Sequence, residues 1–236
     1  MTFNISILAF FLYGIIVYNI KKMLYPFDKE HPTYQITKWQ KGHEHALMIS
    51  PDYWWAFRFK CRIKDKMGNN KKESLNLYVK QNNKANLIAS TILTVFCFIF
   101  YRAYPGSDLS HLLCALSVIR FISRSYEISY AFACDIVQRH ESATGLTKYE
   151  RIRLAFLSYL EIFIYSSAAY TALPAISSLS QAIMLSLNVG TLTNVGYAFD
   201  GLETSLETHI VFIQVVASQS LVILSFAGYL SRDNKS

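Results

Sequence analysis

Two charged side chains lie within apolar stretches of the sequence, where a charge normally needs a partner. Arg120 lies eleven residues after Leu109, where one apolar run begins, and Glu161 lies eight residues after Arg153 in another run. If these runs are helices that enter a membrane from opposite sides, Arg120 lies about 16 Å and Glu161 about 18 Å from the same edge of a core roughly 30 Å thick. We therefore predict an Arg120–Glu161 ion pair. The alternative is that Glu161 faces a pore or a water-filled crevice alone and titrates there.

The other polar residues do not form a catalytic or metal-binding pattern. The sequence offers no paired carboxylates, no nucleophile beside a base and no cluster with metal-ligand spacing. His43-Glu44-His45 supplies only two alternating ligand-type side chains, so we assign it no metal. Arg124 follows Arg120 by four residues, whereas voltage sensors carry several arginines at every third position, so we expect Arg124 to serve in structural pairing. We expect neither an enzymatic activity nor a cofactor.

The composition is typical of a polytopic membrane protein. Of 236 residues, 52% are hydrophobic and only 17% are charged, and the apolar residues occur in blocks. The net charge of +7 is concentrated between residues 21 and 84, where 14 Lys and Arg face 6 Asp and Glu, a local charge of +8. A basic segment of this size indicates a cytoplasmic loop, and we expect no direct contact with nucleic acid. The four cysteines lack the spacing of a disulfide framework or a zinc site.

The apolar blocks predict five transmembrane helices, at residues 1–20, 85–101, 109–137, 154–173 and 209–231. Basic loops follow the first and third of these helices, which places the N-terminus outside and the C-terminus in the cytoplasm of a plasma or bacterial inner membrane. The expected organisation is therefore an N-terminal helix (1–20), a basic cytoplasmic segment (21–84), helices two and three (85–138) and a C-terminal unit (139–236).

The basic segment is predicted to contain a β-hairpin. Apolar residues alternate with basic ones from Phe57 to Lys64, and a second alternation runs from Leu75 to Val79 beyond a turn-like stretch. Two strands alone are marginally stable in water, so we expect the hairpin to pack on more chain, a second subunit or a cytosolic partner.

The stretch 178–200 separates the last two predicted spans. It begins with an apolar run too short to cross a bilayer and continues as Thr191-Leu192-Thr193-Asn194-Val195-Gly196-Tyr197-Ala198. It resembles the pore loop of the two-transmembrane pore-loop potassium channel family, whose filter signature is T-x-T-T-V-G-Y-G-D. The resemblance covers about residues 154–232. It implies a re-entrant loop in which backbone carbonyls of residues 193–198 replace the hydration shell of a monovalent cation, K⁺ in the family.

Two departures from the family pattern lower the expected selectivity. Asn194 occupies the place of the last threonine, and Ala198 occupies the place of the final glycine, where a Cβ makes the filter conformation costly. The acidic residue also comes one position late, as Asp200. The outer mouth still attracts cations, because residues 173–209 contain Asp200, Glu203 and Glu207 and no Lys or Arg.

Two functions fit these features. The first is a cation channel, weakly selective or opened by a trigger, in which several copies surround the ion because one loop cannot encircle it. A homotetramer is the expected form. The second is a non-conducting membrane anchor or sensor subunit, for instance of a bacterial stress or phage-defence complex, that recruits a cytosolic partner through residues 21–84.

Overall fold

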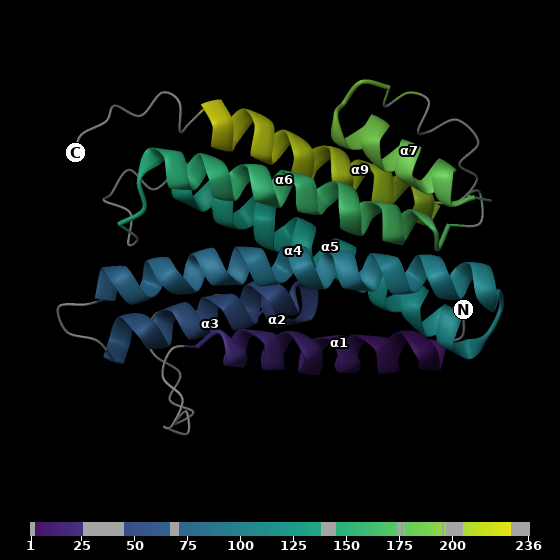
Figure 1. Cartoon of the computed structure of the whole chain (residues 1–236), viewed down its shortest axis with the longest axis horizontal. Coiled ribbons are helices and arrows are strands. Elements are labelled where there is room, and N and C mark those ends of the chain that lie inside the picture. Colours follow the sequence, from purple (N-terminus) through teal and green to yellow (C-terminus); the bar gives the residue numbers. More distant parts are fainter. Residues whose placement is uncertain are drawn as a thin grey trace.

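The computed structural model describes residues 3–25, 45–66, 71–137, 145–173, 176, 178–194, 196 and 205–227. All regular secondary structure in these residues is helical (Figure 1). The helices are α1 (Phe3–Met23), α2 (Ala46–Ile49), α3 (Pro51–Lys66), α4 (Lys71–Ala103), α5 (Asp108–Val137), α6 (Lys148–Tyr170), α7 (Leu179–Gly190), α9 (Ser205–Gln219) and the π-helix η2 (Ser220–Ala227).

Three helices in the described part of the chain are long and apolar enough to cross a membrane. These are Asn4–Met23 in α1, Lys72–Tyr101 in α4 and Lys148–Tyr170 in α6. They cover the first, second and fourth predicted spans. The third prediction corresponds to α5, a 30-residue helix whose Arg120, Arg124 and Glu127 interrupt its apolar sequence. The fifth corresponds to α9 and η2, of which Thr208–Ile223 is apolar but shorter.

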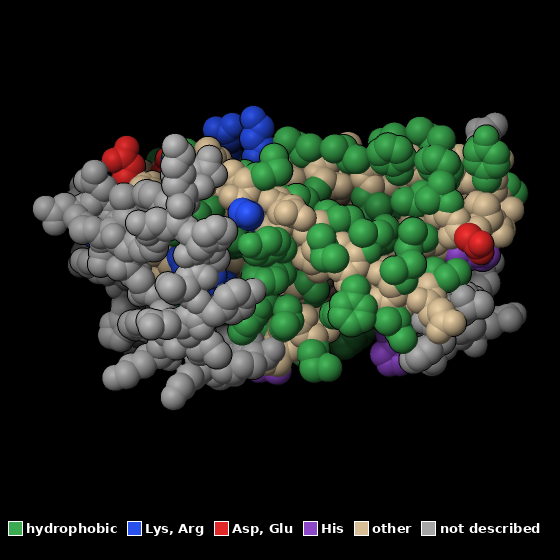
Figure 2. Space-filling view, turned by 90° about the horizontal axis from the view of Figure 1, so that it is seen from below, with side chains coloured by type: hydrophobic (Ala, Val, Ile, Leu, Met, Phe, Trp, Pro, Cys, Tyr) green, Lys and Arg blue, Asp and Glu red, His purple; other side chains and the backbone are tan. Residues whose placement is uncertain are grey.

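The outer surface of the bundle is apolar over its middle. Seen from the side of α1, hydrophobic side chains gather over the middle of the described surface, and Lys and Arg side chains are visible towards one end (Figure 2). On α1 and α4 the exposed large apolar side chains include Ile7, Leu8, Phe11, Ile15, Ile16, Ile88, Ile92, Val95, Phe96 and Ile99. Apolar exposure on this scale is unfavourable in water, and it is consistent with a membrane protein.

Helix α5 lies at the centre of the bundle. Figure 1 shows α1, α3 and α4 on one side and α6, α7 and α9 on the other, and α5 contacts α1, α2, α3, α4, α6, α9 and η2. One end of the bundle, which we call the basic end, holds the end of α3 at Lys66 and the starts of α4 at Lys71 and α6 at Lys148. The opposite end holds the turn between α4 and α5, where Gly106 adopts a φ of +80° that favours glycine.

Helix α3 begins inside the bundle. Ser50 has an extended backbone and separates α2 from α3, and its hydroxyl accepts a 3.0 Å hydrogen bond from the backbone N–H of Tyr53, as an N-cap side chain does. Pro51 occupies the first helical position, where its missing N–H costs nothing. The N-terminus of α3 lies beside Tyr13, ten residues along α1, and so at about half the length of that helix.

The predicted β-hairpin is wrong, because its two strands lie in α3 and α4. The buried residues of α3 include Tyr53, Ala56, Phe59 and Ile63, which recur every three or four positions as on a helix. Arg58, which an alternating strand would place on the solvent face, is only 8% exposed and lies over the rings of Trp54 and Trp55. The second strand forms part of α4, which continues without a break past residue 84.

Candidate functional site

Helix α7 enters the bundle from the opposite end and stops partway along it. Its N-terminus is closed by a capping box in which Ser178 and Gln181 bond to each other's backbone N–H groups. At its C-terminus, the carbonyl of Gly190 accepts a 2.9 Å hydrogen bond from the hydroxyl of Tyr159. Tyr159 lies eleven residues before the end of α6 at Tyr170, which is about 16 Å along the helix axis. Helix α7 therefore ends near the middle of the length of α6.

Three buried polar contacts hold α7 between α6 and α9. The hydroxyl of Ser186 donates to the carbonyl of Phe163 at 2.8 Å. The side-chain amide of Gln214 in α9 donates to the carbonyl of Ser186 at 2.9 Å, and its oxygen accepts from the hydroxyl of Tyr170 in α6. Gln214 is fully buried, so one side chain joins all three helices.

A turn follows α7 and contains the first residues of the stretch 191–198, which resembles a potassium-channel filter. Leu192 has a φ of +60°, which is strained for a residue with a Cβ. The backbone N–H of Thr193 donates to the carbonyl of Asn188 at 3.2 Å, and the hydroxyls of Thr191 and Thr193 lie 2.9 Å apart. The side chains of Thr191, Thr193 and Asn194 are exposed. The chain therefore places exposed polar groups at the inner end of α7.

The rest of the predicted filter and outer mouth is only partly described. Gly196 is exposed. Val195, Tyr197, Ala198, Asp200 and Glu203 lie outside the described residues, and Glu207 lies in α9 but its side chain is outside the described part.

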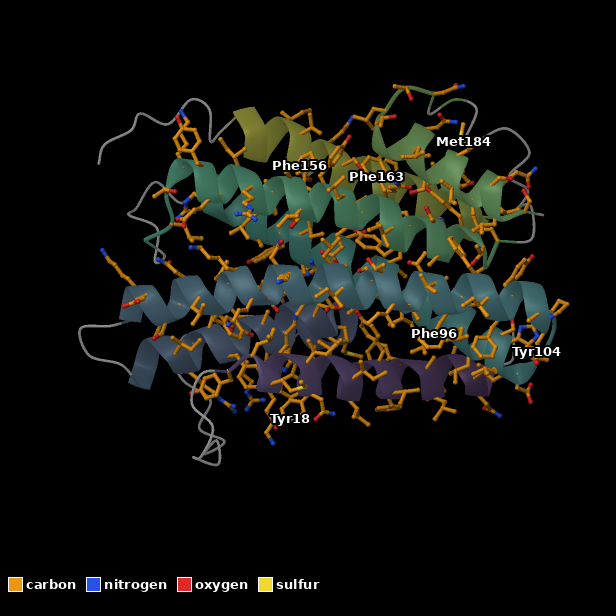
Figure 3. All side chains as sticks on the ribbon, viewed as in Figure 1. Tyr18, Phe96, Tyr104, Phe156, Phe163 and Met184 are labelled. Carbon is orange, nitrogen blue, oxygen red and sulfur yellow. The ribbon has the colours of Figure 1, made fainter. Side chains whose placement is uncertain are left out.

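Gly190 is packed too closely for a larger residue. A Cβ at this position would lie 2.3 Å from Cε1 of Phe163 (labelled in Figure 3), and the ring of Phe163 packs edge-on against Tyr159 with centroids 4.8 Å apart. We expect Gly190→Ala to lower the free energy of unfolding by about 1–3 kcal/mol, because α7 must shift away from α6. Thermal unfolding of the purified protein in detergent measures this change.

Gly14→Ala is the matched control, since a Cβ at Gly14 meets no atom within 4 Å. This variant should be as stable as the wild type or slightly more stable, because glycine is a poor residue for a helix interior. Equal stability of both variants would contradict the close contact between α6 and α7.

A second group of polar residues is buried at the centre of the bundle. The structure brings Arg120 and Glu161 together, with Nη2 and Oε1 3.3 Å apart and side-chain exposures of 3% and 0%. Arg124 makes the shorter contacts, from Nε to Oε1 at 2.8 Å and from Nη2 to Oε2 at 2.6 Å. Arg124 also pairs with Glu127. Glu161 is thus shared by two arginines of α5.

The group extends to α1, α3 and α4. Arg120 donates to the hydroxyl of Ser90 at 2.9 Å and to the backbone carbonyl of Asn86 at 2.7 Å. Asp52 at the start of α3 accepts from the hydroxyls of Tyr13 and Ser123. Lys21 of α1 donates to the side-chain oxygens of Asn82 at 2.5 Å and Asn86 at 2.9 Å, and lies 3.9 Å from Asp52.

The charges of this buried group balance. Lys21, Arg120 and Arg124 supply three positive charges, and three carboxylates, Asp52, Glu127 and Glu161, supply three negative ones; all six side chains are buried. Removing a charge from water is costly, and the cost is recovered only where partners and hydrogen bonds are provided. We call these six residues the buried charge cluster. It joins α1, α3, α5 and α6 and contacts α4, and its ion pairs indicate a structural role, since Glu127 and Glu161 face arginines and Asp52 accepts from two hydroxyls.

Sequence reasoning missed most of this cluster. Lys21 and Asp52 both belong to segment 21–84, which the sequence predicts to be cytoplasmic. One signal pointed to the cluster. Asn82, Asn86, Ser90 and Thr94 recur every four residues on α4, so they form a polar line on one face of an otherwise apolar helix.

In its described residues the chain is thus all-helical, with three helices of membrane-spanning length, a short helix that ends inside the bundle and a buried charge cluster. No family model, curated protein or solved structure matches the chain. In the described residues, no group of three or more His, Cys, Asp and Glu side chains is arranged to hold a metal ion.

Proposed function

We propose that the chain is the subunit of a homo-oligomeric cation channel of the potassium-filter type, with four copies around the pore. One observation carries the proposal. The exposed side chains of Thr191, Thr193 and Asn194 lie at the inner end of α7, about halfway along α6. If α6 crosses the bilayer, this turn lies in the middle of the membrane, where an irregular polar segment is tolerated only in a water-filled cavity or against protein.

The sequence and the contacts of α7 support this proposal independently. The residues that follow Thr193 read Asn194-Val195-Gly196-Tyr197, as in a potassium filter with one substitution. Gln214 fixes α7 to both α6 and α9, which a pore helix needs if its C-terminal end is to hold a loop steady beside an ion path. The apolar face of α7, which includes Met184 at 57% exposure (Figure 3), is available to neighbouring subunits.

The proposed orientation places the basic end in the cytoplasm. The ends of α3, α4 and α6 that carry Lys66, Lys71 and Lys148 lie at this end of the bundle, in agreement with the rule that basic loops stay inside. The N-terminus is then outside, α7 enters from the outside as a pore loop does, and Asp200, Glu203 and Glu207 belong to the outer mouth.

Flux through purified protein in liposomes tests the proposal. We expect K⁺ and Na⁺ to pass with a permeability ratio well below that of a strict potassium channel, because Asn194 and Ala198 replace a threonine and a glycine of the filter. The double variant Asn194→Thr, Ala198→Gly should raise the ratio. Gly14→Ala, remote from the turn after α7, is the control and should leave the ratio unchanged.

Two results would contradict parts of the proposal. A strongly potassium-selective wild type would show that the two substitutions do not weaken the filter. An oligomer that is folded in liposomes but passes no cation would favour the alternative of an anchor or sensor that recruits a cytosolic partner. Of the basic side chains of segment 21–84, Arg58 and Arg62 lie over aromatic rings of their own helix, and residues 26–44 lie outside the described part of the chain.

A further inference from the structure

A cavity of about 200 Å³ lies between α4, α5 and α6, towards the basic end of the bundle. Its wall includes Val79 near the start of α4 and Leu146 just before α6, and Lys60 of α3 also contributes. Its inner wall is formed by Arg124 and Glu127, so it reaches the buried charge cluster. The cavity has no part in the proposed ion path, which lies on the other side of α6 at α7.

The side chains that line the cavity carry a net positive charge. Lys60, Arg124 and Arg151 contribute three positive charges and Glu127 one negative charge, so the balance is +2. Helix α6 begins beside the cavity, between Leu146 and Arg151, and its N-terminus is already capped by Thr147 and Glu150. A cavity of this kind favours an anion.

Asn86 adds a hydrogen-bond donor that is not used inside the protein. Lys21 can only donate, so the Asn86 oxygen that lies 2.9 Å from it must be the acceptor, and the amide nitrogen Nδ2 is left for another partner. Asn86 lines the cavity, is 2% exposed, and its Nδ2 has no hydrogen-bond partner in the described part of the chain. A buried donor without a partner is costly, and a bound acceptor would remove that cost.

We propose that this cavity binds a phosphate group, contributed either by a small soluble compound or by the headgroup of an anionic lipid. Lys60, Arg151 and Asn86 come from three different helices, and donors from several directions suit a phosphate group with its three or four acceptor oxygens. Asn83, whose side-chain oxygen also lacks a partner, accepts from a protonated phosphate oxygen or an attached hydroxyl. This inference goes beyond the proposed function, because binding does not require conduction.

Isothermal titration calorimetry of the full chain in nanodiscs of neutral lipid tests the site, with inorganic pyrophosphate as the probe. We expect saturable binding of one pyrophosphate per chain. Arg151→Gln should weaken it about ten-fold, which is the usual effect of one charge-assisted hydrogen bond. Lys60→Gln should weaken it similarly and replaces Arg151→Gln if that variant does not fold.

Lys80→Gln is the matched control. Lys80 lies on α4 outside the cavity, is 45% exposed and pairs with Glu150 at 2.5 Å, so its removal takes away one nearby positive charge without changing the wall. Affinity should stay within about two-fold of the wild type, since exposed charges are well screened. An equal loss in Lys80→Gln and Lys60→Gln would show diffuse attraction only and would overturn the site.

Nanodiscs that contain phosphatidic acid distinguish the two sources of phosphate. If this lipid raises the unfolding temperature of the wild type but not of Lys60→Gln, and pyrophosphate does not bind, the phosphate belongs to a lipid headgroup. If pyrophosphate binds and the lipid has no effect, the ligand is a soluble compound. If neither probe binds, or if Lys60→Gln and Arg151→Gln leave binding unchanged, the proposal is wrong.

Discussion

Glu161→Gln is expected to lower the free energy of unfolding by about 3–5 kcal/mol, because it leaves two buried arginines without their shared partner. Glu161 is fully buried and accepts from Arg124 at 2.6 and 2.8 Å and from Arg120 at 3.3 Å. Its carboxylate joins α6 to α5. Thermal unfolding in detergent measures the loss of stability, and size-exclusion chromatography measures the loss of folded protein.

Glu150→Gln is the control for this experiment. Glu150 belongs to the same helix but is 37% exposed and pairs with Lys80, and exposed pairs contribute at most about 1 kcal/mol. Glutamine also preserves the capping box with Thr147, since it accepts the same bond from the backbone.

The double variant Arg120→Gln, Glu161→Gln should recover part of the loss. It removes one positive and one negative charge, so Arg124 keeps Glu127 and Lys21 keeps Asp52. If Glu161→Gln alone is as stable as the wild type, Glu161 does not hold the two arginines.

Gln214→Leu is expected to loosen α7 by breaking the side-chain bonds from α9 to α7 and to α6. The substitution leaves the hydroxyl of Tyr170 and the carbonyl of Ser186 buried without a partner, and each such group costs about 1–3 kcal/mol. We therefore expect a clear loss of stability in thermal unfolding, and a loss of cation flux in liposomes where the protein still folds.

Gln219→Leu makes the same chemical change on the same helix at an exposed position. It should leave both stability and flux close to the wild type, because no described contact depends on it. A Gln214→Leu protein that unfolds and conducts like the wild type would show that α7 is held by its apolar contacts alone.

The positions of the long helices could be predicted because the apolar blocks are bounded by charges. α1, α4 and α6 each end or begin close to the predicted limits, and α5 and α9 are helical as expected. The expected depths of Arg120 and Glu161 in the membrane could also be compared from the sequence, because depth follows from the rise per residue of a helix. The shorter contact of Arg124 with Glu161 could not be predicted. Arg120 and Arg124 are four residues apart and share a helix face, so only the crossing of α5 and α6 decides which of them lies closer to Glu161.

The hairpin prediction failed for a physical reason. Between Phe57 and Lys64 the apolar residues alternate with Lys and Arg, whose long aliphatic stems can be buried while the charged ends reach outwards. Arg58 is buried over tryptophan rings, so the alternation of residue types does not report an alternation of burial. The helical spacing of Tyr53, Ala56, Phe59 and Ile63 was also present in the sequence and was the correct signal.

The start of α3 inside the bundle sets an order for biosynthesis. Ser50 donates to the carbonyl of Ser123 at 2.7 Å, and the backbone N–H of Asp52 donates to the hydroxyl of Ser123 at 3.1 Å. Ser123 is made more than 70 residues after these partners. While the ribosome is still translating α4, the polar N-terminus of α3 has no α5 to bond with. We therefore expect the start of α3 to dock in the bundle only after α5 has been made.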